Sequence, residues 1–191
     1  MSPRTPFAAF AAVLLAVTLT AGCSGSEDLG PLGDPAAAQQ RIDSLIDGTL
    51  KAITPAVPPR QDWWYRYREE RNGINNNTGY TEVERQSYLE ERIAEGKQRV
   101  LLGQAEKYWS DQGCTVGAEK SDSLRVYVSA TCADKAVAVV EIGKDGVALV
   151  KALVEKTKLG SGPSPFPNTL SPRPTASETP VGKRDHPYWS H

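Results

Sequence analysis

Proline is distributed very unevenly along this chain, which limits the part that can fold into a compact domain. Seven of the fourteen prolines lie in residues 160–191. Proline lacks a backbone N–H and fixes φ, so it is poorly tolerated inside helices and central strands. The same residues are rich in Ser and Thr and poor in apolar side chains, so we predict a disordered Pro/Ser/Thr-rich tail. The folded domain is expected to end near residue 159.

Close to its end, the tail carries two adjacent aromatic residues, Tyr188 and Trp189. This is unusual in a segment that is not expected to have a core of its own. Two interpretations remain open: the pair docks back onto the domain, or it forms a short linear recognition motif.

The first residues have the three-part pattern of a secretory signal peptide. Arg4 is the only charged residue before Glu27, and an almost wholly apolar run covers residues 7–19. That run is too short to cross a hydrocarbon core of about 30 Å comfortably. Small residues follow it, and we therefore predict that residues 1–22 are a signal peptide.

The end of this segment, residues 19–23, reads Leu-Thr-Ala-Gly-Cys. It resembles the lipobox of bacterial lipoproteins, although that family prefers Leu at the position of Thr20. The resemblance implies that Cys23 receives a diacylglyceryl group and becomes the new N-terminus, whose amine is often acylated too, for example with palmitate. Two lipid chains anchor a protein where one does not. The alternative is an ordinary signal peptide followed by a chance cysteine.

The resemblance to lipoproteins implies where in the cell the domain is located. With its Ala- and Arg-containing start and its Pro-rich end, the whole chain resembles lipoproteins of actinobacteria. It is then expected on the cell membrane, lipid-anchored at the extracytoplasmic face. Residues 23–33 are rich in Gly, Ser and acidic residues, which predicts a flexible tether between the lipid and the domain.

The domain expected over residues 34–159 begins with a helix signal. Asp34 and Pro35 supply an N-cap and a proline at the first helical position. Apolar residues then recur at helical spacing as far as Ile53. Farther along, residues 63–70 alternate in a way that predicts a strand.

A second helix is predicted from residue 81 to residue 112. Thr81-Glu82-Val83-Glu84 has the form of a capping box, and apolar residues follow at helical spacing. Gly96 weakens this helix, and a break there is the alternative.

The remainder predicts strands over residues 114–119, 124–132 and 136–143. An Asp145-Gly146 turn follows. Residues 147–156 are then a fourth strand or a terminal helix, and the turn favours the strand. The predicted fold is α+β, with two helices packed on an antiparallel sheet of three to five strands in the order α-β-α-β-β-β(-β).

Two cysteines inside the domain, Cys114 and Cys132, are predicted to form a disulfide. They lie equally far from residue 123, so cross-strand pairing about that point places them opposite each other. Opposed strand residues meet the distance of about 4.4–6.8 Å between Cα atoms that a disulfide requires. A metal pair or a catalytic thiol would need partners, and no other Cys and no His lies in the predicted domain.

The composition excludes several kinds of site. The chain has 22 Lys and Arg against 23 Asp and Glu, and this balance argues against binding nucleic acid through bulk positive charge. Both histidines, His186 and His191, lie in the tail, so no Ser-His-Asp arrangement is expected within the domain. Glu91 and Glu95 would lie one turn apart on the predicted second helix. The surrounding Arg and Lys residues indicate a solvated face there rather than a catalytic pair.

The strongest candidate for a ligand face lies in the aromatic strand. Trp64, Arg66 and Arg68 share one side of the predicted alternation, opposite the other aromatic residues. Aromatic rings interleaved with arginines stack on sugars or bases. The alternative is an amphipathic strand whose aromatic side chains pack under the helices.

The sequence therefore favours a non-catalytic binding or accessory module of the cell envelope, without a cofactor or a metal. Its partner would be an envelope protein or a glycan. The alternative is an envelope enzyme that works without histidine, for which a buried carboxylate pair or a Ser–Lys contact in a pocket would be the sign.

Overall fold

The computed structural model describes residues 30–59, 64–72, 76–158 and 184–191, with the backbone alone for 30–31, 64–72 and 76–78. The predicted signal peptide, Cys23, most of the tether and residues 160–183 of the tail lie outside the described residues. The described elements are, in chain order, η1 (Gly30–Gly33), α1 (Pro35–Ala52), β1 (Trp64–Asn72), β2 (Asn76–Arg92), α2 (Glu95–Asp111), β3 (Thr115–Val116), β4 (Lys120–Ser121), β5 (Arg125–Thr131), β6 (Val137–Gly143) and β7 (Val147–Lys158).

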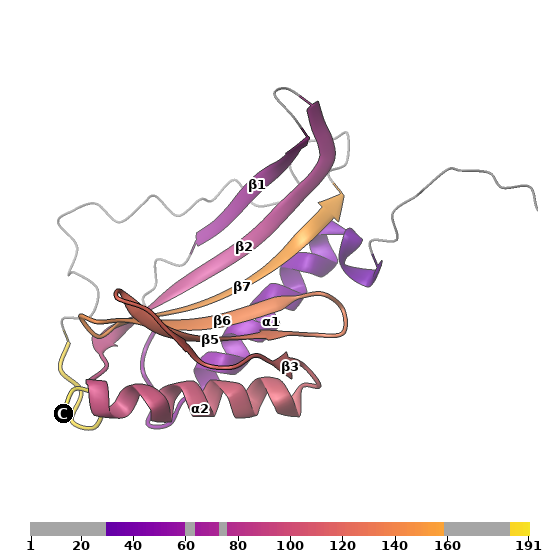
Figure 1. Ribbon diagram of the computed structural model, residues 1–191. Helices are drawn as coiled ribbons and strands as arrows, with labels where there is room; N and C mark the ends of the chain where they lie inside the picture. Colours follow the sequence, from indigo (N-terminus) through magenta and orange to yellow (C-terminus); the bar gives the residue numbers. More distant parts are fainter. Residues whose placement is uncertain (1–29, 60–63, 73–75, 159–183) are drawn as a thin grey trace, which may run out of the picture.

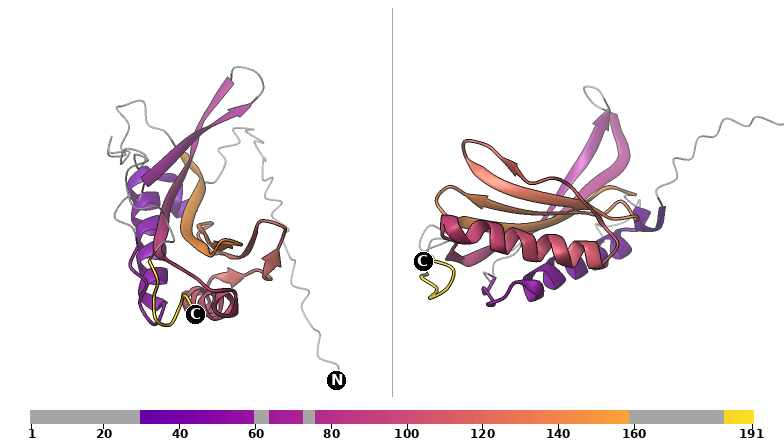
Figure 2. Two further views of the ribbon diagram at one scale, coloured as in Figure 1. Left: turned by 90° about the vertical axis from the view of Figure 1, so that its left-hand side faces the viewer. Right: turned by 60° about the horizontal axis from the view of Figure 1, so that its bottom comes forward.

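The described part of the chain folds into one antiparallel sheet with helices α1 and α2 on the same face (Figures 1 and 2). The strand order is β1-β2-β7-β6-β5-β3, and the short β4 also pairs with β5. Helix α1 contacts β2 and β7, whereas α2 contacts β5, β3 and β6. The predicted α+β class is confirmed, with five longer strands and two strands of two residues each.

Helix α1 begins and ends close to where the sequence predicts. The Asp34 carboxylate accepts the N–H of Ala37 at 2.9 Å, so it caps the helix, and Pro35 occupies the first helical position. The apolar stripe of the helix is buried against the sheet. Its buried residues are Ala38, Ile42, Leu45, Ile46 and Thr49.

The single long helix predicted for residues 81–112 is wrong in its first half. Residues 76–92 form strand β2, and only Glu95–Asp111 is helical, after a break close to the alternative at Gly96. Strand β2 hydrogen-bonds β1 along one edge and β7 along the other. The hairpin ladder with β1 and the ladder with β7, which is distant in the chain, together override the local helix signal.

The C-terminal half of the domain is a meander of antiparallel strands. Strand β6 lies between β5 and β7, and its side chains are largely buried. Residues 147–158 form a strand, which is the alternative that the Asp145-Gly146 turn favoured. The strand predicted for residues 114–119 is shorter, because the pairing with β5 covers only Thr115 and Val116 before the chain bulges away to β4.

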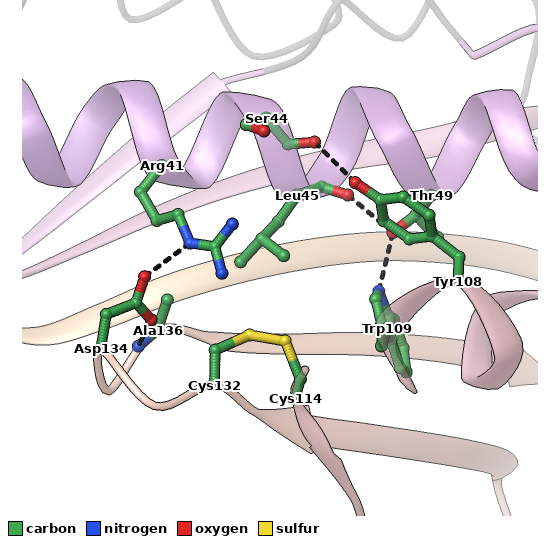
Figure 3. Close-up of a disulfide and its surroundings, with 10 residues drawn as sticks. All are labelled: Arg41, Ser44, Leu45, Thr49, Tyr108, Trp109, Cys114, Cys132, Asp134 and Ala136. Atoms are coloured by element: carbon green, nitrogen blue, oxygen red, sulfur yellow. Dashed lines mark hydrogen bonds and ion pairs between the residues drawn. A yellow bond between two sulfur atoms is a disulfide. The ribbon is translucent and has the colours of Figure 1, made fainter. Parts of the chain in front are cut away.

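The predicted disulfide between Cys114 and Cys132 is present and buried (Figure 3). Thr115 pairs with Thr131 in the adjacent ladder, so the two cysteines are opposed across the strands as the symmetry about residue 123 required. Their Cα atoms are 4.0 Å apart. The bridge joins the end of α2 to the edge of the sheet, beneath α1.

Candidate functional site

The predicted ligand face is placed by the backbone of β1 alone. Trp64, Arg66 and Arg68 pair with Gln86, Glu84 and Glu82 of β2. Tyr65 and Tyr67 pair instead with Arg85 and Val83, and these β2 residues belong to the helix-covered side, where Val83 is in the core and Arg85 reaches Asp43 of α1. The alternation predicted from the sequence is therefore kept in the register. The side chains of Trp64, Arg66 and Arg68 lie outside the described part of the structure.

The sheet face opposite the two helices carries a network of charged and aromatic side chains. Arg125 of β5 donates from Nη1 to the Glu141 carboxylate of β6 at 2.6 Å, and Lys151 Nζ of β7 lies 3.4 Å from the same oxygen. The Arg125 guanidinium also lies 5.1 Å from the centre of the Tyr127 ring. We call this side the open face. Its described members include Tyr88, Arg125, Tyr127, Glu141, Leu149 and Lys151.

Two turns meet at one end of this sheet and hold Arg125 in place. The Lys144 N–H of the β6–β7 turn donates to the Leu124 carbonyl of the β4–β5 turn at 2.9 Å. Asp122 accepts the N–H groups of Leu124 and Arg125 at 2.8 and 3.0 Å. These backbone bonds, together with the nearby Arg125 charge, lower the pKa of the Asp122 carboxyl.

The β6–β7 turn is also tied to the junction between β2 and α2. The Ile93 N–H donates to the Gly146 carbonyl at 2.9 Å, and Arg92 Nε donates to the Asp145 carbonyl at 2.6 Å. Gly146 has φ of +82°, and a Cβ there would lie 2.8 Å from the Ile93 carbonyl oxygen. Only glycine fits this close approach.

The last eight residues complete this end of the molecule. Trp189 is fully buried in the core. Of the two interpretations of the aromatic pair, the structure therefore shows the one in which it docks onto the domain. Its indole Nε1 donates to the Pro55 carbonyl at 2.7 Å, and its own carbonyl accepts the Ala94 N–H at 2.7 Å. The Tyr188 ring lies under Lys97, with Nζ 4.0 Å from the ring centre.

Two cavities open beside these turns. A cavity of about 410 Å³ lies on the helix side, between the start of α2 and the two turns, with Arg92, Glu95 and Ser190 among its walls. A second cavity of about 390 Å³ lies on the open face and is lined by Tyr88, Leu124 and Leu149, among others. Three residues of the turns, Arg125, Lys144 and Asp145, line both cavities.

We call the part of the molecule around the two cavities the loop end. It comprises residues 121–126, 143–147, 92–95 and 184–191.

The loop end was not identified from the sequence, because its parts are far apart in the chain. The Asp145-Gly146 turn was a visible signal for one part. Nothing local in the sequence indicates that residues 92–95 and Ser190 meet that turn. The prediction of Glu91 and Glu95 on one helix is also wrong, since Glu91 lies in β2 and Glu95 begins α2.

A buried carboxyl lies under the C-terminal segment. Glu91 is 8% exposed, and its Oε2 lies 3.9 Å from Nε2 of His186. Burial raises the pKa of the Glu91 carboxyl, and the neighbouring His186 and Arg184 act in the opposite direction. His186 Nδ1 accepts the backbone N–H of Tyr188 at 3.0 Å, so the imidazole also orders the turn before Trp189.

The raised pKa of Glu91 predicts a pH-dependent stability. The folded chain holds this proton more tightly than the unfolded chain, so the contribution of Glu91 is most favourable at low pH. It is lost as pH rises from about 4, the ordinary glutamate value, through the folded pKa. Glu91→Gln should therefore gain stability relative to the parent chain over that range in urea denaturation series. Glu155→Gln, at an exposed position, controls for the loss of one carboxylate. If the stability of Glu91→Gln relative to the parent chain stays constant or decreases as the pH rises through this range, the prediction is wrong.

The two cavities are lined by both polar and apolar side chains. Within the described ranges, no group of three or more His, Cys, Asp or Glu residues is arranged to hold a metal ion. None of the helices described is long and apolar enough to cross a membrane. On the open face, Arg125 and Lys151 both form ion pairs with Glu141. These ion pairs hold hydrogen-bonding groups at fixed positions on the open face, with aromatic and aliphatic side chains between them.

Comparison of the chain with models of protein families, with curated proteins and with solved structures gives no match.

Proposed function

We propose that this chain is a lipid-anchored module at the extracytoplasmic face of the cell membrane that binds a protein of the envelope and carries out no reaction itself. Residues 1–22 would direct export, and the Cys23 thiol would carry the lipid. The support for this address is the apolar run before the Leu-Thr-Ala-Gly-Cys sequence and the disulfide, which is typical of exported domains.

The observation that carries the binding role is the loop end with its two cavities. Leu124 is 75% exposed at the rim of the open-face cavity. Beside it stand cations and carboxylates held in defined ion pairs. A protein bound at this place would cover the Leu124 side chain and meet the polar groups around it, in the usual arrangement of an apolar centre with a polar rim.

In-cell photo-crosslinking tests this proposal. A photo-reactive amino acid at Leu124 should capture one envelope protein in good yield, because the side chain lies at the rim of the cavity. The same amino acid at Lys107, whose side chain is 75% exposed on α2, is the matched control and should not capture that protein. The products are identified by mass spectrometry after purification from membranes.

Two further results decide the proposal. A Cys23→Ala chain should leave the membrane fraction and lose the crosslink. If Leu124 and Lys107 give the same products, or if the position at Leu124 gives none, the loop end is not a protein-binding surface. If Cys23→Ala stays in the membrane fraction, the chain is not anchored through that residue.

A further inference from the structure

The distance between the proposed lipid and the folded domain is short. Cys23 precedes Gly30, the first residue of η1, by seven positions. Seven residues span at most roughly 25 Å, whatever conformation they take. Element η1 is itself held in place, because Leu32 is 6% exposed and belongs to the core cluster, and η1 contacts both α1 and β7.

The loop end lies at the opposite end of the molecule from η1. Helix α1 has 18 residues and starts beside η1; at 1.5 Å per residue it is about 27 Å long. Just beyond its far end, the Pro55 carbonyl accepts the Trp189 indole N–H. Figure 1 shows the described chain entering at one side of the molecule and the C-terminus at the other.

Strand β7 gives the same separation independently. It starts at Val147, in the wall of the open-face cavity, and ends at Lys158 beside η1 (Figure 1). Its 12 residues span about 35–40 Å. The turn between β5 and β6 lies at the same end of the molecule as η1. It is joined to the first half of α1 by the Arg41–Asp134 ion pair at 2.7 Å. Helix and strand therefore run between the same two ends.

From these lengths we infer that the lipid holds the domain with η1 toward the bilayer and the loop end directed away from it. This inference rests on the proposed lipidation of Cys23. The inverted arrangement, with the loop end on the bilayer, would need a tether about as long as β7, which spans about 35–40 Å between the loop end and η1. Seven residues are too short for that. The loop end therefore meets a partner that projects into the envelope space, not the lipid surface.

The charges of the loop end fit this kind of partner. The helix-side cavity is lined by the cations Arg92, Arg125 and Lys144 and by the carboxylates of Glu95 and Asp145. Anionic lipid headgroups attract clusters of Lys and Arg without interspersed acids. A surface with both signs close together is complementary to a protein surface that also carries both signs.

Energy transfer to the membrane tests the orientation. The full lipidated chain is reconstituted in vesicles that contain an acceptor dye on the lipid headgroups. A donor dye is attached through a non-natural amino acid either at Lys158, exposed beside η1, or at Leu124 in the loop end. We expect clearly higher transfer from position 158 than from position 124. A flexible Gly-Ser insertion of about twenty residues after Ser26 should remove most of this difference, because the longer tether lets the domain turn.

The outcomes separate the orientation from the anchor. Equal transfer from the two positions, or more from position 124, would overturn the orientation while the anchor stands. No transfer from either position would show that the chain is not held at the membrane, and the proposed lipidation would fail with it. The Cys23→Ala chain sets the background for both readings.

Discussion

Replacing Trp189 by alanine is expected to lower the free energy of unfolding by about 3–5 kcal/mol. The side chain is fully buried although it is the third residue from the C-terminus. The substitution removes a large apolar surface from the core. It also leaves the Pro55 carbonyl without the indole N–H that it accepts at 2.7 Å. Urea denaturation, followed by circular dichroism, measures the effect.

The matched control is His191→Ala, two residues farther along at an exposed position. It should change the stability by no more than about 0.5 kcal/mol. A loss of less than about 1 kcal/mol for Trp189→Ala would contradict the packing of the C-terminal segment in the core. The variant should also weaken crosslinking at Leu124, because Trp189 and Ala94 hold part of the loop end together.

Removing the disulfide is the second change with a large expected effect. Cys114→Ala with Cys132→Ala should cost about 3 kcal/mol of stability, because the bridge closes a loop across 18 positions of the unfolded chain. Both cysteines are buried, so small apolar replacements avoid leaving an unpaired thiol in the core. Thermal and urea denaturation of the oxidised parent and the double variant give the difference.

A reducing agent provides the internal control for the bridge. It should destabilise the parent chain and leave the double variant unchanged, since the variant has no bridge to reduce. A parent chain whose stability is the same with and without the reductant would show that the bridge does not contribute to folding.

The misassigned segment 81–92 shows where local sequence is insufficient. Its glutamates and arginines are good helix formers, and Leu89 and Ile93 fit a helical spacing as well as a strand. The buried Arg85 makes sense only in three dimensions, where its guanidinium pairs with the Asp43 and Asp47 carboxylates of α1 at 2.7 and 3.1 Å. Arg85 can be buried in β2 because α1, which packs on this strand, supplies both carboxylates.

The candidate site was harder to predict from the sequence than the fold was. The aromatic and basic residues of β1 are contiguous in the sequence, so alternation alone predicted which of them share a side. The loop end joins residues as distant as Ala94 and Trp189 through single backbone hydrogen bonds. Such contacts leave no periodic pattern in the chain.

The sequence by itself determined the features that depend on near neighbours. Helix α1 follows from the Asp34-Pro35 cap and its apolar stripe. The Asp145-Gly146 turn favoured the β6–β7 hairpin over a terminal helix, and symmetry about one turn predicted the pairing of Cys114 with Cys132. Only the tertiary structure decided that residues 76–92 are a strand and that Trp189 completes the core. Both depend on surfaces contributed by distant segments, and burial against those surfaces outweighs the local preference of the chain.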